Sequence, residues 1–156
     1  YERSGIGGLS GGGRRNRKPG EKRPNEFADI ARQYVGESEG RITDGGFRER
    51  ILNHSMMERA FQLTAQRAVQ ENSSGRTPGE ATSIFKLVGS TLARDGAELK
   101  STLMGTQGMG WSGEAFSATE LETTKNWLSN RAVTIYGGTN EVQMNIIAKR
   151  VLGLPD

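Results

Sequence analysis

The chain has 156 residues, which is enough for one domain with a real hydrophobic core. It contains no cysteine, so disulfide scaffolds, thiolate metal sites and cysteine nucleophiles are excluded. The net charge of +3 does not by itself call for nucleic acid, and no apolar run approaches the roughly 20 residues of a membrane helix. We therefore expect a protein that binds neither nucleic acid nor membrane, and the lack of cysteine fits a cytoplasmic location.

The first 25 residues are dominated by glycine and positive charge. Residues 1–10 are typical of a helix stub that ends in glycine, and residues 11–25 are typical of a flexible basic loop. A nucleic-acid-binding module in this loop would need interleaved aromatic residues or a recognised motif, and the loop has neither. Its positive charges are therefore interpreted as a solvated surface rather than as an anion site; they include Arg14, Arg15, Arg17, Lys18 and Lys22.

Apolar residues at helical spacing predict two helices in the next part of the chain. Phe27, Ile30, Ala31 and Tyr34 recur at intervals of three and four, which predicts a short amphipathic helix over 26–35. A longer pattern over 47–70 has the wide apolar stripe that is typical of a bundle helix. This stripe includes Phe47, Ile51, Met57, Phe61 and Ala68, with Leu52, Met56, Ala60 and Leu63 beside it.

Two helix-start signals organise the second half. The sequence TPGE at 77–80 has a capping threonine, a proline at the first helical position and a glutamate that completes a capping box. The helix that it opens runs to about residue 104. After a glycine-rich loop, a second capping box from Ser117 to Glu120 opens a helix that reaches about residue 132.

The last helix begins at Thr139 or Asn140 and ends before Gly153, with Pro155 just beyond it. No segment shows convincing strand alternation, and the longest β-branched stretch, 132–136, lies between helices. The sequence therefore predicts an all-α fold. We expect a four-helix up-and-down bundle with an additional short helix and the basic glycine-rich N-terminal loop.

Few residues have the pattern that chemistry requires. His54 is the only histidine and lies inside a predicted helix, whereas a catalytic triad needs a histidine in a pocket with a supporting acid. Metal binding would have to rely on carboxylates alone, so we expect no metal. Gly137 and Gly138 stand before Thr139 at the start of the last helix. They form either a tight turn that Thr139 caps, or a place where a ligand approaches the backbone.

The whole C-terminal segment is more informative than this turn. RAVTIYGGTNEVQMNIIAKRVLGLPD, residues 131–156, closely resembles the C-terminal signature of the acyl-CoA dehydrogenase family. YERSGIGG at the start, SIFKL at 83–87 and LMGTQGMG at 103–110 resemble family segments in the same order and spacing. The resemblance covers the chain from end to end and is weakest over 11–50. It implies that residues 1–156 are the C-terminal helical domain of a longer enzyme, whose N-terminal helical and middle β domains lie outside this chain.

The resemblance also implies an activity. Such enzymes are FAD-dependent oxidoreductases of fatty acid metabolism, which convert an acyl-CoA thioester to the trans-2-enoyl-CoA. A carboxylate takes the α-proton while the β-hydrogen leaves as hydride to FAD, and the electrons pass to an electron-transfer flavoprotein or a similar acceptor. We expect a homo- or hetero-oligomer, dimer or tetramer, and an isolated domain without activity. The alternative is a non-catalytic or structural subunit of a paired complex.

The catalytic glutamate occupies one of two places in the family. Many members carry it in a Tyr-Glu-Gly-Thr signature, where this chain has Gly137. Others, such as the isovaleryl-CoA and long-chain dehydrogenases, carry it in a Glu-Arg pair, which here is Glu2–Arg3. The resemblance therefore implies Glu2 as the base, with Arg3 and Gly137 next to the substrate. A glycine at 137 would leave room for a bulky or branched acyl group.

Two sets of residues resemble the FAD contacts of the family. The first set lies at the start of the last helix and comprises Tyr136, Gly137, Gly138, Thr139 and Gln143. The second set resembles a segment that reaches the FAD of a neighbouring subunit and comprises Gly105, Gln107 and Gly108. Two departures stand out. The Arg-x-x-Phe-Gly motif, which grips the FAD pyrophosphate in many members, is not present, and Met144 stands where arginine is common.

Overall fold

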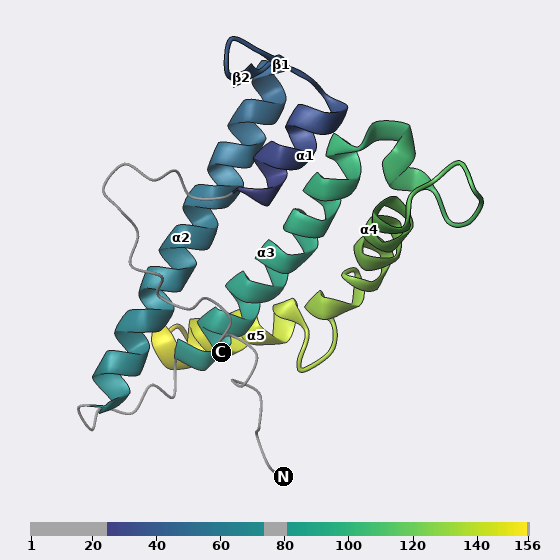
Figure 1. Cartoon of the computed structure of the whole chain (residues 1–156). Helices are drawn as coiled ribbons and strands as arrows, with labels where there is room; N and C mark the ends of the chain where they lie inside the picture. Colours follow the sequence, from purple (N-terminus) through teal and green to yellow (C-terminus); the bar gives the residue numbers. More distant parts are fainter. Residues whose placement is uncertain (1–24, 74–80, 156) are drawn as a thin grey trace.

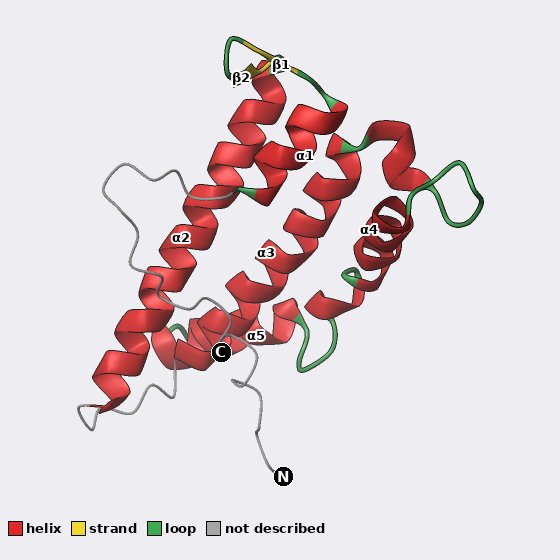
Figure 2. Ribbon diagram, viewed as in Figure 1, coloured by secondary structure: helices red, strands yellow, loops and turns green. Residues whose placement is uncertain are grey.

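The computed structural model describes residues 25–73 and 81–155 (Figure 1). Five α-helices account for most of these residues, and Figure 2 shows how little of the described chain is strand. The all-α class is therefore confirmed. The elements are α1 (Glu26–Tyr34), β1 (Glu37–Ser38), β2 (Arg41–Ile42), α2 (Gly45–Ser73), α3 (Ala81–Leu103), the 3₁₀ turn η1 (Gly105–Met109), α4 (Ala118–Ser129), the 3₁₀ turn η2 (Ala132–Thr134), α5 (Asn140–Ile146) and a π-helical turn (Ile147–Val151).

Helix α3 lies at the centre of the arrangement. It contacts α1, α2, α4 and α5 and both 3₁₀ turns, and Figure 1 shows α2 on one side of it and α4 on the other. Ile51 packs in one cluster with Leu99, whereas Phe61 meets Phe85 edge-on at 5.9 Å between ring centroids. Later residues of α2 thus meet earlier residues of α3, so the two longest helices are antiparallel.

The hydrophobic core lies where α1 crosses the α2–α3 pair. Its buried members come from these three helices: Phe27, Ala31, Ile51, Leu99 and Leu103. Burying side chains of this size stabilises the fold by roughly 1.5–3 kcal/mol each. The predicted spacing of apolar residues in 26–35 therefore identified the correct inward face of α1.

The two-stranded hairpin was not predicted. Strands β1 and β2 are antiparallel, with Glu37 opposite Ile42 and Ser38 opposite Arg41. Glu39 and Gly40 form the turn between them with φ values of 51° and 75°, the left-handed conformation that two-residue hairpin turns require. Each strand has only two residues, which is too short for an alternation of apolar and polar residues to appear in the sequence.

The capping box at α4 is confirmed. Ser117 Oγ accepts from the Glu120 N–H at 3.3 Å, and Glu120 Oε2 accepts from the Ser117 N–H at 2.6 Å. The helix ends at Ser129, earlier than predicted, and residues 132–134 form the separate turn η2. At the other predicted start signal, Thr77, Pro78 and Glu80 lie outside the described residues, as do the stub and basic loop over 1–24.

Candidate functional site

The Gly-Gly-Thr segment forms a tight turn at the mouth of α5. Gly137 and Gly138 have φ values of 70° and 92°, which L side chains rarely adopt. Thr139 is the N-cap, and its Oγ1 accepts from the Val142 N–H at 3.2 Å. The capped tight turn, one of the two alternatives from the sequence, is therefore present. We refer to residues 136–139 as the GGT turn.

The two glycines have different surroundings. A Cβ on Gly138 would lie 2.8 Å from Gln143 Nε2, whereas a Cβ on Gly137 would meet nothing within 4 Å. Tyr136, directly before them, leaves 63% of its surface exposed. A side chain on Gly138 would therefore displace the amide of Gln143. Gly137 instead presents bare backbone to open space beside an exposed aromatic ring, so a ligand has room to approach there.

Gln143 braces the turn from within α5. Its Nε2 donates to the Gly137 carbonyl at 3.4 Å, and its side chain is buried. The structure therefore places Gln143 against the inner side of the turn rather than on its open side.

Glu141 is the carboxylate closest to the turn in sequence. Hydrogen bonds from its own backbone N–H and from the Thr139 hydroxyl lower its pKa, and the nearby charge of Lys86 acts in the same direction. Glu141 is thus held in its ionised form. A carboxylate in this state is suited to stabilising the start of a helix rather than to taking a proton from carbon.

The second predicted set lies on the turn η1. Gly105 has a φ of 58° with open space around its Cβ position, and the Gln107 N–H donates to the Met104 carbonyl at 3.2 Å. Gly108 is buried, and a Cβ there would overlap the Ser101 carbonyl. Packing against α3 therefore requires glycine at position 108, whereas only the positive φ favours glycine at position 105.

The Gly108 carbonyl joins η1 to two helices. It accepts from Ser101 Oγ of α3 at 2.7 Å and from Thr124 Oγ1 of α4 at 3.0 Å. The acceptor and both donors are buried. These bonds fix the turn at the C-terminal end of α3.

The structure does not bring the two predicted sets together. The GGT turn is followed by Asn140, which bonds to Ser90 of α3, whereas Gly108 bonds to Ser101. Eleven residues of helix separate these anchors, which is about 16 Å along the axis. The GGT turn is therefore anchored near the middle of α3, whereas η1 is anchored at its C-terminal end.

The hairpin before α2 lies at the same end of the α2–α3 pair as η1, because those helices are antiparallel. It contains Arg41, and Arg41-x-x-Asp44-Gly45 keeps the arginine and the glycine of the family's Arg-x-x-Phe-Gly motif at the same spacing. Asp44 stands in the place of phenylalanine and caps α2, accepting from the Phe47 N–H at 2.8 Å. The complete motif is absent, as the sequence indicated, and Arg32 and Gly36 have the same spacing.

Two arginines near the hairpin are placed differently. Arg48 donates to the Ile42 carbonyl at 2.6 Å and to the Thr43 carbonyl at 3.4 Å, so it secures the connection into α2. Arg41 is exposed, and within 25–73 and 81–155 its guanidinium makes no hydrogen bond or ion pair. Arg41 is therefore one cation at this end whose charge is not paired within the described residues.

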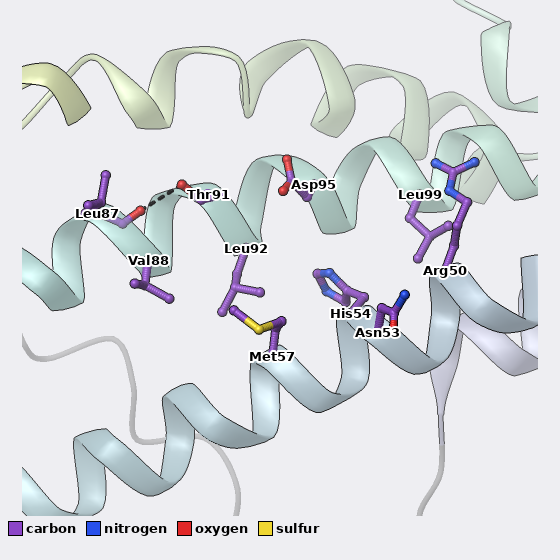
Figure 3. Close-up of a pocket in the computed structure, with 10 residues that line it drawn as sticks. All are labelled: Arg50, Asn53, His54, Met57, Leu87, Val88, Thr91, Leu92, Asp95 and Leu99. Carbon is purple, nitrogen blue, oxygen red and sulfur yellow. Dashed lines mark hydrogen bonds between the residues drawn. The ribbon is translucent and has the colours of Figure 1, made fainter.

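A groove of about 420 Å³ lies between α2 and α3 (Figure 3). Met57 and Leu92 point into its middle, with His54 beside them. The ring of His54 meets Phe27 edge-on at 4.8 Å between centroids. Burial lowers the pKa of His54, although Glu58 and Asp95 oppose that shift. Asp95 itself pairs with Arg94 at 2.8 Å, so His54 packs as a largely neutral ring, and residues 25–73 and 81–155 form no catalytic triad around it.

The remaining expectations concern the predicted base, a metal site and a membrane helix. Glu2 and Arg3 lie outside the described residues. Within the part of the chain that the structure describes, no group of three or more histidine, aspartate or glutamate side chains is arranged to hold a metal ion. In the same residues, no helix is both long enough and apolar enough to cross a membrane.

Comparison with known proteins agrees with this arrangement. The family model for the acyl-CoA dehydrogenase C-terminal domain matches residues 25–152. Acyl-CoA dehydrogenase IpdE1 of Mycobacterium tuberculosis is 40% identical over 108 residues, which are 69% of this chain and 26% of that protein. Its namesake in Mycolicibacterium smegmatis is 40% identical over 78 residues, which are 50% of this chain and 19% of that protein. The chain spans about a quarter of the length of these curated relatives, and it belongs to the acyl-CoA dehydrogenase family.

Proposed function

We propose that the chain is the C-terminal domain of an FAD-dependent acyl-CoA dehydrogenase, with its N-terminal helical and middle β domains in the same longer protein. The reaction is α,β-dehydrogenation of an acyl-CoA thioester to the trans-2-enoyl-CoA, and the electrons pass to an electron-transfer flavoprotein or a similar acceptor. FAD, when bound, supplies the hydride acceptor. Membership of the family and the names of both relatives support this proposal.

The open side of the GGT turn is the observation that carries the proposal. Gly137 presents backbone without a side chain to open space, and Tyr136 offers an exposed ring next to it. A flat ring system needs a surface of this kind. Gly138, Thr139 and Gln143 keep the turn in shape beneath it. These five residues would hold FAD at the mouth of α5.

The η1 end would meet a second flavin, bound mainly by a neighbouring subunit. Gly105, Gln107 and Gly108 lie about 16 Å along α3 from the anchor of the GGT turn, and they resemble the segment with which the family reaches the FAD of a neighbouring subunit. Arg41 would add a cation for a pyrophosphate at this end. The protein is then a homo- or hetero-oligomer, dimer or tetramer.

The outer face of α2 supports an oligomer. Leu52, Met56 and Leu63 recur at intervals of four and seven, so they share one face of the helix. All three are exposed, and they point away from the face that carries Ile51 and Phe61. An apolar stripe of this kind normally meets another protein surface.

The base must lie outside the GGT turn. Gly137 has no carboxylate, and Glu141 has a lowered pKa, whereas a base for an α-proton needs a raised one. Glu2 is the proposed base, with Arg3 and Gly137 beside the substrate. The missing side chain at 137 would admit a bulky or branched acyl group.

The test is made on the full-length protein. We expect it to purify yellow, with a flavin spectrum that an acyl-CoA from a panel of chain lengths and branching patterns bleaches. Glu2→Gln should keep the colour and lose the bleaching, and Glu141→Gln is the matched control that should keep both. A full-length protein that takes up no FAD would overturn the proposal.

One observation favours a second function, that of a non-catalytic subunit in a paired complex. Glycine stands at position 137, where many relatives carry their glutamate. In that case the full-length protein binds FAD, but no acyl-CoA bleaches it until an unlike partner subunit is added. Bleaching by the protein alone would exclude this alternative.

A further inference from the structure

We infer that Asn140 is a positioning residue, which fixes the GGT turn against α3 through a partly buried polar cluster. The cluster consists of Asn140, the first residue of α5, and of Lys86, Ser90 and Thr91 on α3. The structural part of this inference stands by itself, whereas its consequence for FAD rests on the proposed function.

Three hydrogen bonds join the Asn140 carboxamide to α3. Its Oδ1 accepts from Lys86 Nζ at 3.0 Å and from Ser90 Oγ at 2.8 Å, and its Nδ2 donates to Thr91 Oγ1 at 3.4 Å. Asn140 is only 9% exposed. A buried carboxamide without hydrogen-bond partners would be strongly unfavourable. The Asn140 side chain must therefore stay against its partners on α3.

The donors and acceptors in the cluster set the orientation of the carboxamide. Lys86 can only donate, so it must face the oxygen of Asn140. The Thr91 hydroxyl gives its proton to the Leu87 carbonyl at 2.8 Å, which leaves its oxygen free to accept from Nδ2. Exchanging the oxygen and nitrogen of the carboxamide would place Nδ2 against Lys86 Nζ, a donor against a donor, and Oδ1 against the Thr91 oxygen, whose proton is already donated to Leu87. The cluster therefore holds one arrangement.

Asn140 is available for this role because Thr139 caps the helix. A short polar side chain at a helix start usually bonds to the N–H groups of its own first turn. Here Thr139 Oγ1 takes that bond from Val142, and the Asn140 side chain points to a different helix. The link thus runs from the end of the turn to the central helix of the fold.

The turn needs such a link because of its glycines. Gly137 and Gly138 lose more backbone freedom on folding than other residues do. Gln143 holds the turn from α5, but α5 is a single short helix, and among the described residues it packs mainly against α3. Asn140 converts a mobile glycine pair into a surface with a fixed shape, and a fixed surface binds a rigid ligand without a further ordering cost.

The experiment compares Asn140→Ala with Asn145→Ala in the full-length protein. Asn145 is the matched control because it lies on the same helix, is exposed and has no hydrogen bond among the described residues. Two readouts are taken. Hydrogen exchange of the backbone over 135–143 reports on the turn without FAD, and titration with FAD gives its dissociation constant.

Asn140→Ala should exchange faster over 135–143 and bind FAD about tenfold more weakly, while Asn145→Ala matches the wild type in both. Lys86→Met should shift both readouts in the same direction as Asn140→Ala, and adding it to Asn140→Ala should change little more. Asn140→Asp keeps both acceptor contacts and should lie between wild type and Asn140→Ala. Should Asn140→Ala fail to fold, Lys86→Met and Asn140→Asp decide by the same two measurements.

Wild-type exchange and wild-type FAD affinity in Asn140→Ala would overturn the inference. Faster exchange with unchanged FAD affinity would leave the residue structural and overturn the positioning role. A wild-type protein that binds no FAD at all would instead overturn the proposed function, and hydrogen exchange alone would then decide whether Asn140 fixes the turn.

Discussion

The Tyr34 hydroxyl donates a hydrogen bond to Glu120 Oε1 at 2.8 Å, joining α1 to α4 across 86 positions of sequence. The other oxygen of the same carboxylate completes the capping box of α4 by accepting from the Ser117 N–H. One carboxylate therefore both caps α4 and fixes α4 to α1. Its protonation state should influence stability.

The first prediction concerns acid stability. Hydrogen bonds from Ser117 and then from Tyr34 lower the pKa of Glu120 below its usual 4.5. The unfolded chain therefore binds this proton more readily than the folded chain does. The stabilisation by the Glu120 carboxylate is present above pH 4.5 and is lost as the pH falls through the lower pKa of the folded chain. The melting temperature of Glu120→Gln should lie below that of the wild type at pH 7, and the two should converge towards pH 3.

Glu122→Gln is the control for this measurement, since that side chain is exposed and lies on the same helix. It should keep the wild-type acid profile. Equal melting temperatures of Glu120→Gln and wild type at pH 7 would show that the carboxylate contributes nothing beyond its neutral isostere.

The second prediction concerns His54. Burial lowers its pKa below the usual 6.5, against the opposing charges of Glu58 and Asp95 and in the same direction as that of Lys100. The unfolded chain takes up the proton first, so stability should fall as pH drops below about 6.5. This window lies above that of Glu120, so the two effects separate.

His54→Gln should flatten the melting temperature between pH 7 and 5 while leaving flavin reduction by an acyl-CoA at pH 7 within about twofold of wild type. Loss of flavin reduction in a folded variant would assign His54 to the chemistry. If His54→Gln leaves the pH dependence of the melting temperature unchanged, the pKa of His54 is the same in the folded and unfolded chains.

How far the sequence predicts this molecule depends on the range of each signal. The capping box of α4 and the threonine cap of α5 are local, since donor and acceptor are three residues apart. The first was predicted correctly, and the second is one of the two alternatives that the sequence left open. The bond from Tyr34 to Glu120 connects distant residues, and nothing in either local sequence indicates the other. The hairpin was missed because its strands are too short to show a pattern.

The candidate site shows the same division. The family signature identified the GGT turn, and Thr139 caps α5 as its position suggested. The sequence did not reveal that Gln143 turns inward or that Asn140 bonds to α3, because both depend on how α5 packs. Arg41 was overlooked for a different reason. Asp44 stands at the position that phenylalanine would occupy, so the sequence around Arg41 does not show the motif.

The third prediction separates the two glycines of the GGT turn. Both have positive φ values, which cost an L residue roughly 1–2 kcal/mol. Gly137→Ala should cost about that much because its Cβ meets open space, whereas Gly138→Ala should cost more because its Cβ would lie 2.8 Å from Gln143 Nε2. Chemical denaturation measures both. Adding Gln143→Ala should recover part of the loss in Gly138→Ala and none in Gly137→Ala, and equal costs for the two glycines would contradict this account.

The fourth prediction compares Arg41 with Arg48 at the η1 end. Arg41→Gln removes a charge that has no partner among the described residues, so the melting temperature should hardly change. The dissociation constant for FAD should rise by between about tenfold and a hundredfold, the usual worth of a charge-assisted hydrogen bond. Arg48→Gln should instead lower the melting temperature and leave the dissociation constant for FAD unchanged. It removes two hydrogen bonds to the carbonyls before α2 and no proposed FAD contact. Titration with FAD and thermal unfolding are measured on the same preparations of the full-length protein. Wild-type FAD affinity in Arg41→Gln would show that the partial motif at Arg41–Gly45 does not contact the flavin.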